Sequence, residues 1–419
     1  MNRVSIISIG DEILIGQTLN TNAAYIGEKL TALGFEVIKS FVIGDEKLSI
    51  HESLRSASED SEFIFITGGL GPTHDDITRD SIVEYFKTEF VFNESVLKRI
   101  EERFQKRERK MPEVNRQQAY VPKNATVIEN FVGTAPGYDI SHKGKTYFVM
   151  PGVPSEMKSM MENYIIPKMK KNAEENEIFY RQRLLYTTGI PESGLFELLD
   201  DINSWLGNCK LAFLPSQFGV KMRISHRGST IEEIDEELDN VEKQITELVG
   251  KYIYSNEELL LEEVVGKILL QRKLTIAVAE SCTGGIITDR ITNISGSTKY
   301  FLQGVISYSN DSKIKTLGVN VDSIIKYGSV SEQVAIEMAR GVRNISSANI
   351  GVSTTGIMGP TGATETKPIG LVYIGYVDDD KEKVVRYRFA ENRLRNKERT
   401  SQAALELIRR MLLGIADET

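Results

Sequence analysis

The sequence predicts an α/β protein in three parts: an α/β unit over residues 1–170, a small α+β module over 178–254 and a second α/β unit over 255–416. In the first and last parts, short apolar runs alternate with amphipathic segments of helix length, which is typical of a mostly parallel sheet covered on both faces. A polar, charged stretch over 168–177 is typical of a linker, and the pattern changes beyond it. A chain of 419 residues accommodates three parts, since domains contain about 100–200 residues.

The composition excludes several classes of protein. Apolar residues make up 41% and charged residues 26% of the chain, which is typical of a globular protein. No apolar run reaches the roughly 18–20 residues of a membrane span, and the run over 4–9 is too short for a signal peptide. Two isolated cysteines, Cys209 and Cys282, make neither a disulfide framework nor a paired metal site. The net charge of −8 argues against a broad basic footprint for duplex DNA, although it leaves room for a local basic patch. Together these observations predict a cytoplasmic protein without a membrane contact, for which nucleic acid is not an expected partner.

Each part has its own order of expected elements. In the first part, apolar runs predict strands over 4–9, 35–43, 63–67 and 146–150, and amphipathic segments predict helices over 22–33, 47–58, 77–86 and 94–109, with a loop-rich stretch before the last strand. The middle module has an expected strand over 183–188, a helix over 193–206, a hairpin over 210–227 and a long amphipathic helix over 231–248. The last part has expected helices over 257–271, 332–343 and 396–413, and strands over 274–279, 301–308, 349–355, 371–377 and 383–389.

The strongest motif of the first part is the run from Thr67 to Asp76, which contains Gly68, Gly69 and Gly71. A strand that leads directly into glycines allows the backbone to approach a ligand, and N–H groups at a helix start suit phosphate. The adjacent carboxylates Asp75 and Asp76 suit a divalent cation held against a pyrophosphate. The alternative is a tight turn in which one of these aspartates caps the next helix.

Two further loops leave the first and last strands of this part. The first contains Gly10, Asp11 and Glu12, followed by Asn20 and Asn22. Because ligands gather at the carboxyl ends of parallel strands, we expect this loop to meet the glycine run at one edge of the sheet. Helix capping is the alternative for both asparagines. The second loop, over 151–156, is explained at least as well by a rigid turn in which a serine caps the helix.

The strongest motif of the last part is Glu280-Ser281-Cys282-Thr283-Gly284-Gly285, between an expected buried strand and a helix. A hydroxyl at such a turn lies close to backbone donors that can stabilise an oxyanion. Ser281 needs a base, and because no histidine lies nearby, Lys313 is the candidate. The alternatives are Ser281 as a helix N-cap, Cys282 as a small buried residue and Lys313 as a solvated helix lysine. Glycines over 356–362 and 367–370 indicate either a nucleotide-sized pocket or ordinary loops.

Taken together, these blocks resemble the CinA family of competence/damage-inducible proteins, in the family's order and over essentially the whole chain. The resemblance implies a molybdopterin-binding-like three-layer α/β domain, a small KH-like α+β module and a C-terminal α/β amidohydrolase domain. The module lacks the GxxG element that clamps RNA in working KH domains, so a spacer or dimerisation role is expected for it.

The resemblance also implies two hydrolytic activities and their residues. The last domain would convert nicotinamide mononucleotide to nicotinate mononucleotide and ammonia without a cofactor, with Ser281 as nucleophile and Lys313 as base. Its substrate-binding residues would be Thr283, Gly284, Tyr308, Asn310, Gly356 and Arg393. The first domain would cleave ADP-ribose to AMP and ribose 5-phosphate with a divalent metal such as Mg²⁺ held by Asp75 and Asp76. Its ligand-binding residues would be Gly10, Asp11, Glu12, Asn22, Gly68, Gly69 and Gly71. A homodimer is also implied.

The chain departs from the family pattern at two positions, and alternatives remain open. Ala363 stands where a second glycine is usual, and Glu391 stands where a glycine is usual, two residues before Arg393. Arg393, in the position expected to meet the substrate phosphate, is alternatively one member of a basic surface run with Arg395 and Lys397. For the first domain the alternative is a pterin-binding module, and for the whole chain a non-catalytic partner in DNA uptake or recombination.

Overall fold

A computed structural model describes residues 2–73, 76–106, 108–176, 179–390 and 392–416. The chain divides into two compact units, one made of residues 1–181 and 226–237 and the other of residues 182–225 and 238–419. Within the described residues, no helix is both long enough and apolar enough to cross a membrane.

The first unit contains a six-stranded sheet in the order β2-β1-β3-β8-β7-β6. Its parallel strands are β2 (Glu36–Ile43), β1 (Arg3–Ile9), β3 (Phe63–Thr67) and β8 (Lys145–Met150). The strands β7 (Gly137–His142) and β6 (Ala125–Ile128) continue the sheet in antiparallel fashion. The predicted parallel sheet is therefore confirmed, and part of the stretch expected to be loop adds two strands to it.

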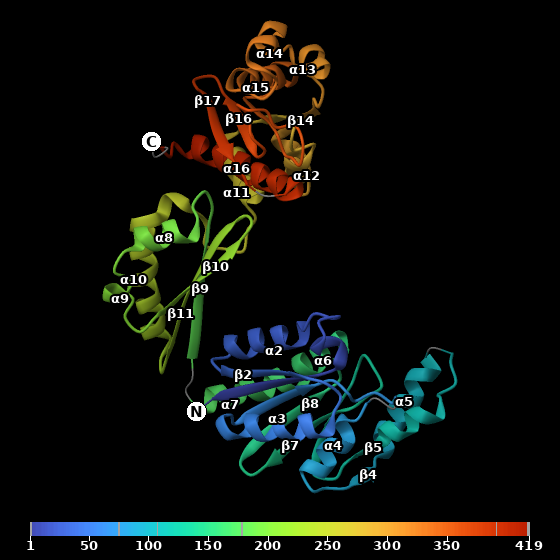
Figure 1. The fold of residues 1–419 in the computed structure, drawn as a ribbon. Coiled ribbons are helices and arrows are strands. Elements are labelled where there is room, and N and C mark those ends of the chain that lie inside the picture. Colours follow the sequence, from blue (N-terminus) through green and yellow to red (C-terminus); the bar gives the residue numbers. More distant parts are fainter. Residues whose placement is uncertain (1, 74–75, 107, 177–178, 391, 417–419) are drawn as a thin grey trace. The chain divides into compact units, whose positions relative to one another are not determined.

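Helices cover both faces of this sheet (Figure 1). On one face, Ile6 and Phe65 pack in a cluster with residues of α2 (Thr21–Ala32), α6 (Pro154–Met160) and α7 (Ile166–Glu175). On the other face, Ile7 and Ile66 pack with residues of α3 (Lys47–Asp60) and α4 (Thr78–Tyr85). Neighbouring strand residues thus point to opposite faces, and both sets find apolar partners because the parallel strands are apolar throughout. A further helix, α5 (Glu94–Lys106), adds Val96 and Ile100 to the second cluster.

The linker predicted over 168–177 is wrong, because α7 occupies the stretch as far as Glu175. The charged residues that suggested a linker form i,i+4 pairs on the helix surface, Lys170 with Glu174 and Lys171 with Glu175. Met169 and Ala173, on the other side of the same turns, are buried. A short amphipathic helix with two apolar residues has little hydrophobic periodicity, and the dense charge concealed it.

The middle module forms a four-stranded sheet in the order β10-β11-β9-β12. The strands are β9 (Phe179–Thr187), β10 (Lys210–Ser216), β11 (Gly219–Gly228) and β12 (Ile253–Ser255). The predicted hairpin is β10–β11, and the long amphipathic helix is α10 (Ile231–Val249). The helix predicted over 193–206 is interrupted: α8 (Glu192–Leu199) ends before Asp200, which has a φ of 36°, and α9 (Ile202–Trp205) follows.

The C-terminal domain contains a five-stranded sheet in the order β14-β13-β15-β16-β17. Its strands are β13 (Ile276–Glu280), β14 (Phe301–Ile306), β15 (Ile350–Gly356), β16 (Leu371–Val377) and β17 (Glu382–Arg388), of which the first three are parallel and the last two form an antiparallel hairpin. One face is covered by α11 (Leu261–Arg272), α12 (Ile286–Thr292) and α16 (Arg393–Leu413), and the other by α15 (Glu332–Ser346) (Figure 1). Beside α15 lie α13 (Asn310–Leu317) and α14 (Val321–Tyr327).

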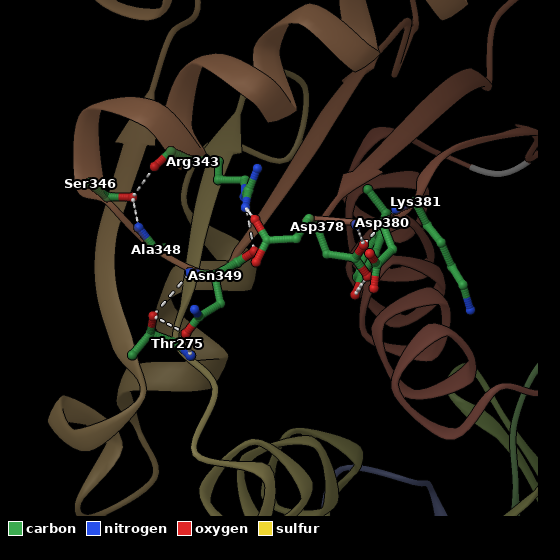
Figure 2. A network of polar contacts seen from close by, with 10 residues as sticks. Thr275, Arg343, Ser346, Ala348, Asn349, Asp378, Asp380 and Lys381 are labelled. Carbon is green, nitrogen blue, oxygen red and sulfur yellow. Dashed lines mark hydrogen bonds and ion pairs between the residues drawn. The ribbon is translucent and has the colours of Figure 1, made fainter.

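A polar network fixes the amino ends of β13 and β15 relative to each other (Figure 2). The backbone N–H and the hydroxyl of Thr275 both donate to Asn349 Oδ1, and the N–H of Asn349 donates to Thr275 Oγ1. Arg343, at the end of α15, donates to the carbonyl of Asn349 and pairs with Asp379. The carboxyl ends of the same strands, where the candidate site lies, are therefore held in register from the opposite end.

The helix α16 joins the C-terminal sheet to the middle module within the second unit. Gln402 donates to the hydroxyl of Thr188, and the guanidinium of Arg409 donates to the carbonyls of Lys251 and Ile253. Arg409 is 2% exposed and also pairs with Glu406 on its own helix. Buried polar groups of α16 are thus satisfied by backbone and side chains of the module.

Candidate active sites

The loop after β13 is shaped by the side chain of Glu280, which is fully buried. Its carboxylate accepts hydrogen bonds from the N–H groups of Gly285, Ile287 and Thr288 and from the Thr288 hydroxyl, at 2.8–3.2 Å. These donors belong to the start of α12, whose N-cap is Gly285 with a φ of 101°. The carboxylate takes the place of a conventional cap. The interpretation of Ser281 as the N-cap of this helix is therefore wrong, and its hydroxyl is available for another partner.

That partner is Lys313, one turn into α13 on the next crossover of the chain. Lys313 Nζ lies 2.9 Å from Ser281 Oγ, 2.9 Å from the carbonyl oxygen of Ser307 and 3.2 Å from that of Tyr308. The lysine is only 2% exposed, and Ser281 is buried as well. The alternative of a solvated helix lysine is wrong, and the two predicted residues are brought together.

Burial governs the protonation of this site. Desolvation lowers the pKa of Lys313 below the ordinary value of 10.5. A neutral amine has two hydrogens and one lone pair, which match two carbonyl acceptors and one hydroxyl donor. Burial also raises the pKa of the Cys282 thiol to about 12, so this sulfur stays protonated at neutral pH. The expectation that Cys282 is a small buried residue is confirmed.

The remaining predicted residues of this site lie on neighbouring loops. The guanidinium of Arg393, at the start of α16, donates to the carbonyl of Gly359 and to the hydroxyl of Tyr308. Thr283 is buried, and its hydroxyl lies 2.7 Å from that of Thr354 on β15. Asn310 is exposed at the start of α13.

Gly356 and Gly284, two predicted residues of this site, require a glycine for different reasons. A side chain at Gly356 would approach the carbonyl of Leu371 to 2.7 Å, so close packing against β16 accounts for this glycine. Gly284 has a φ of 63°, a conformation that favours glycine. Glu391 lies outside the described residues.

In the first unit, three loops converge at the carboxyl edge of the parallel strands, as expected. The amide of Asn22 donates to the hydroxyl of Thr67 at 3.0 Å and to the carbonyl of Gly152 at 2.8 Å. The Thr67 hydroxyl in turn donates to the carbonyl of Pro151. Capping applies to Asn20, which accepts from the N–H of Ala23, but not to Asn22. The buried Oδ1 of Asn22 has no hydrogen-bond partner among the described residues.

The glycines of this edge permit close backbone approach. A Cβ on Gly68 would lie 2.0 Å from the carbonyl oxygen of Ile9, and one on Gly69 would lie 2.1 Å from Thr78 Oγ1. Both glycines have positive φ angles, 115° and 66°, and Gly10 has a φ of 156°. The loops after β1 and β3 can therefore adjoin only because these positions carry no side chain.

The carboxylate of Asp76 holds the glycine loop in shape. It accepts from the N–H of Gly71 at 2.8 Å, from the N–H of Thr73 at 2.9 Å and from the Thr73 hydroxyl. The N-cap of α4 is Ile77, so the alternative in which Asp76 caps that helix is wrong. A glycine is required at position 71 because a Cβ there would lie only 2.4 Å from this carboxylate. Asp75 lies outside the described residues.

The comparisons with known proteins agree with the order of these parts. Three family models match: “Probable molybdopterin binding domain” over residues 5–171, “Damage-inducible protein CinA KH domain” over 182–255 and “CinA C-terminal domain” over 258–412. A competence-damage inducible protein of Caldicellulosiruptor saccharolyticus is 42% identical over 409 residues, covering 98% of this chain and 99% of that protein. The chain belongs to the CinA family.

Two further CinA-family proteins are similar to this chain, one over nearly its whole length and one over part of it. A CinA-like protein of Chloroherpeton thalassium is 41% identical over 416 residues, covering 97% of this chain and 98% of that protein. The crystal structure of the protein CinA from Thermoplasma acidophilum is 35% identical, covers 41% of this chain and 98% of that one, and has a TM-score of 0.37. The predicted three-part fold class, with a molybdopterin-binding-like domain, a KH module and a CinA C-terminal domain, is confirmed.

Sequence reasoning on this CinA-family chain missed Asp45 at the first site. The N–H of Asp11 donates to Asp45 Oδ2 at 3.1 Å, and the N–H of Asp45 donates to Asp11 Oδ1 at 3.3 Å. Desolvation, together with the carboxylates of Asp11, Glu12 and Asp76, raises the pKa of Asp45. The sequence offers one indication of this placement: Asp45 follows β2 by two residues, and β2 is the parallel neighbour of β1, so both strands end at the same edge. A set of oxygen ligands with mutual repulsion suits a hard divalent cation.

The second missed residue is Lys397, at the C-terminal site of this CinA-family chain. Its Nζ lies 3.4 Å from the point that a Cβ on Gly284 would occupy, so the ammonium faces the loop that carries Ser281. The sequence predicts Lys397 only as one member of a basic surface run. The available signal was its spacing from Arg393, since residues four apart lie on one face of a helix.

Proposed function

We propose that this CinA-family protein is a bifunctional hydrolase of pyridine nucleotides. The C-terminal domain deamidates nicotinamide mononucleotide to nicotinate mononucleotide and ammonia, and the N-terminal domain cleaves ADP-ribose to AMP and ribose 5-phosphate. The observation that carries the first activity is the buried contact of 2.9 Å between Ser281 Oγ and Lys313 Nζ. A buried lysine, whose pKa desolvation lowers, beside a serine hydroxyl is the arrangement of a nucleophile with its base.

The acylation half of the deamidase reaction uses this pair directly. Ser281 Oγ attacks the carboxamide carbon while its proton moves to the lone pair of Lys313 Nζ. Backbone N–H groups of the loop after Ser281 stabilise the oxyanion that forms. The lysine then returns the proton to the amide nitrogen, the carbon–nitrogen bond breaks, and ammonia leaves an acylated serine.

Deacylation repeats the sequence with water as the nucleophile. Neutral Lys313 takes a proton from water, the hydroxide adds to the ester carbon, and the proton returns to Ser281 Oγ as the ester bond breaks. The net change is amide plus water to acid plus ammonia. Thr283, Gly284, Tyr308, Asn310, Gly356 and Arg393 line the substrate pocket in this proposal.

At the N-terminal site, the glycine loops and the carboxylates have different roles in binding a pyrophosphate. The loop of Gly68, Gly69 and Gly71, which lacks side chains, would let the pyrophosphate approach the backbone closely, and Asp75 and Asp76, with Asp45 beside Asp11, would hold the divalent cation. Bound there, a divalent cation supplies Lewis-acid polarisation of a phosphoryl oxygen. The unpartnered Oδ1 of Asn22 at the same loop junction accepts a ribose hydroxyl or a water molecule.

The test of the deamidase is ammonia release from nicotinamide mononucleotide by the full chain, beside Ser281→Ala. The substitution should lower the rate by roughly 10³-fold or more, because the nucleophile is lost. A variant that keeps most of the rate would disprove the serine mechanism. For the N-terminal site, Asp75→Asn/Asp76→Asn should abolish ADP-ribose cleavage. Binding of molybdopterin without ADP-ribose cleavage would favour the pterin-binding alternative.

A further inference from the structure

Lys397 is an ammonium without a counter-ion beside the candidate nucleophile. It is half-buried on α16, and its Nζ lies against Gly284, three residues after Ser281. No carboxylate in the described part of the chain pairs with it, although Glu280 lies on the same loop. The oxygens of Glu280 are instead committed to the N–H groups of α12 and the Thr288 hydroxyl.

The neighbouring cation, Arg393, is held differently. Its guanidinium donates from Nη1 to the carbonyl of Gly359 at 2.9 Å and from Nη2 to the Tyr308 hydroxyl at 3.0 Å. Neither acceptor is charged, so the positive charge of Arg393 is also uncompensated by these two partners. Arg393 and Lys397 lie four residues apart on a 21-residue helix, hence on one face with about 5–6 Å between their Cβ atoms.

We propose that Lys397 binds the phosphate of the mononucleotide and selects phosphorylated over unphosphorylated nucleosides. A phosphate monoester carries a charge of about −1.5 to −2 at neutral pH, which matches two adjacent cations. Lys397 approaches it as a point charge from the side of Gly284, and Arg393, fixed by Gly359 and Tyr308, approaches from the other loop. The inference rests on the proposed deamidase function, whose reaction centre it extends.

The basic residues over 393–397 therefore differ in role: Arg393 and Lys397 belong to the proposed phosphate site, and Arg395 remains a surface residue. Arg395, the middle member, is exposed, and only its backbone N–H has a hydrogen bond in the described structure, to the Asn392 cap. Arg395 therefore offers a matched control, because its substitution removes the same charge from the same turn of helix without touching the Gly284 loop.

The kinetic test compares Lys397→Met with Arg395→Met on nicotinamide mononucleotide and on nicotinamide riboside, which lacks the phosphate. Lys397→Met should raise KM for the mononucleotide about tenfold or more, with kcat nearly unchanged, because a charge-assisted contact is lost. KM for the riboside should not change. Lys397→Arg should restore most of the affinity. An equal rise in KM for both substrates, or no rise for the mononucleotide, would overturn the proposal.

A binding measurement separates this inference from the deamidase assignment. Calorimetric titration of inorganic phosphate into the Ser281→Ala protein reports the anion site without turnover. Affinity should fall about tenfold in Ser281→Ala/Lys397→Met and stay constant in Ser281→Ala/Arg395→Met. If nicotinamide mononucleotide is never hydrolysed but this difference is found, the deamidase fails and the anion site stands. Equal phosphate affinity in both variants, with unchanged melting temperatures, would disprove the site.

Discussion

At the residue scale, the decisive feature is that Lys313 is buried from solvent and has three polar atoms within hydrogen-bond distance of Nζ. Water stabilises an ammonium far better than two carbonyls and a hydroxyl do, so burial favours the neutral amine. The two carbonyl oxygens accept hydrogens from Lys313 Nζ, and the Ser281 hydroxyl, 2.9 Å away, can donate to the lone pair of the neutral form. Arginine could not replace it, because a guanidinium stays protonated throughout the accessible pH range.

The first prediction is a pH dependence of deamidation. Below the pKa of Lys313 the rate constant kcat/KM should rise about tenfold per pH unit and then level off, because only the neutral amine accepts the serine proton. Since burial lowers this pKa, the plateau should begin below pH 10.5. Stopped assays of ammonia release across pH measure it. Lys313→Arg should be inactive at every pH, and a rate that falls as pH rises would contradict the assignment.

The second prediction concerns the neighbouring thiol. Cys282→Ala should keep deamidase activity within about threefold, because burial keeps the sulfur protonated and it makes no nucleophile. Alkylating reagents should leave the folded enzyme active for the same reason. Complete loss of activity in Cys282→Ala, with an intact melting transition, would show that the Cys282 thiol and not the Ser281 hydroxyl is the nucleophile.

Local motifs identified some site residues and could not identify others. Ser281 and Lys313 could be proposed because each stands in a distinctive block, and the structure brings them within hydrogen-bond distance. Asp45 and Lys397 stand in no motif. Each becomes visible only when strand order or helix spacing places it beside a motif from elsewhere in the chain.

At the element scale, α11, α12 and α16 are joined by one nearly buried guanidinium. Arg290 on α12 pairs with Glu262 on α11 at 2.7 Å and donates to Ser401 and Gln402 on α16. Each of these hydrogen bonds of the Arg290 guanidinium links α12 to another helix, so the cluster fixes their relative positions as well as neutralising the charge. The start of α12, which carries the loop of Ser281, depends on this arrangement.

The third prediction follows from that cluster. Glu262→Ala should lower the free energy of unfolding of the C-terminal domain by about 3–5 kcal/mol, because it leaves Arg290 charged and without its partner in a low-dielectric site. Urea denaturation followed by circular dichroism measures the change. Glu262→Leu/Arg290→Met should recover most of the loss. A single variant as stable as the parent would show that water reaches Arg290.

Elements with strong periodicity were predictable, and those defined by their neighbours were not. The helix α10 and the hairpin β10–β11 follow from local pattern alone. The strands β6 and β7 lie in a stretch that contains Gly133, Pro136 and Gly137, and they become strands through pairing, β7 with β8 and β6 with β7. The helix α7 was missed because its charges hid the two residues that it buries.

At the scale of the whole molecule, the two proposed sites lie in different compact units. The N-terminal site is made entirely of residues before 153, and the C-terminal site entirely of residues after 279. Their chemistry differs as well, since the first is built from carboxylates and glycine loops and the second from a serine and an amine. A change at one proposed site should therefore alter the activity of that site and leave the activity of the other site unchanged.

The fourth prediction is a separation of the two activities by chelation. Treatment of the full chain with a chelator should abolish ADP-ribose cleavage and leave ammonia release unchanged, because the proposed reactions use a divalent cation at the carboxylate site alone. Asp45→Asn should weaken activation by Mg²⁺ without affecting the deamidase. Parallel assays on one preparation measure both. Loss of ammonia release on chelation, restored by metal, would contradict a metal-free serine site.

The contacts of α16 with the middle module decide where the chain can be divided. This helix spans about 30 Å, with Arg393 and Lys397 at one end and Arg409 near the other. A fragment cut at residue 255 would strip Gln402 of Thr188 and Arg409 of two carbonyls. Because these polar groups would lose their partners, we expect a C-terminal fragment to need the chain from ahead of Thr188 for full stability. The KH module thus supplies hydrogen-bond partners to α16, the helix that also carries Arg393 and Lys397.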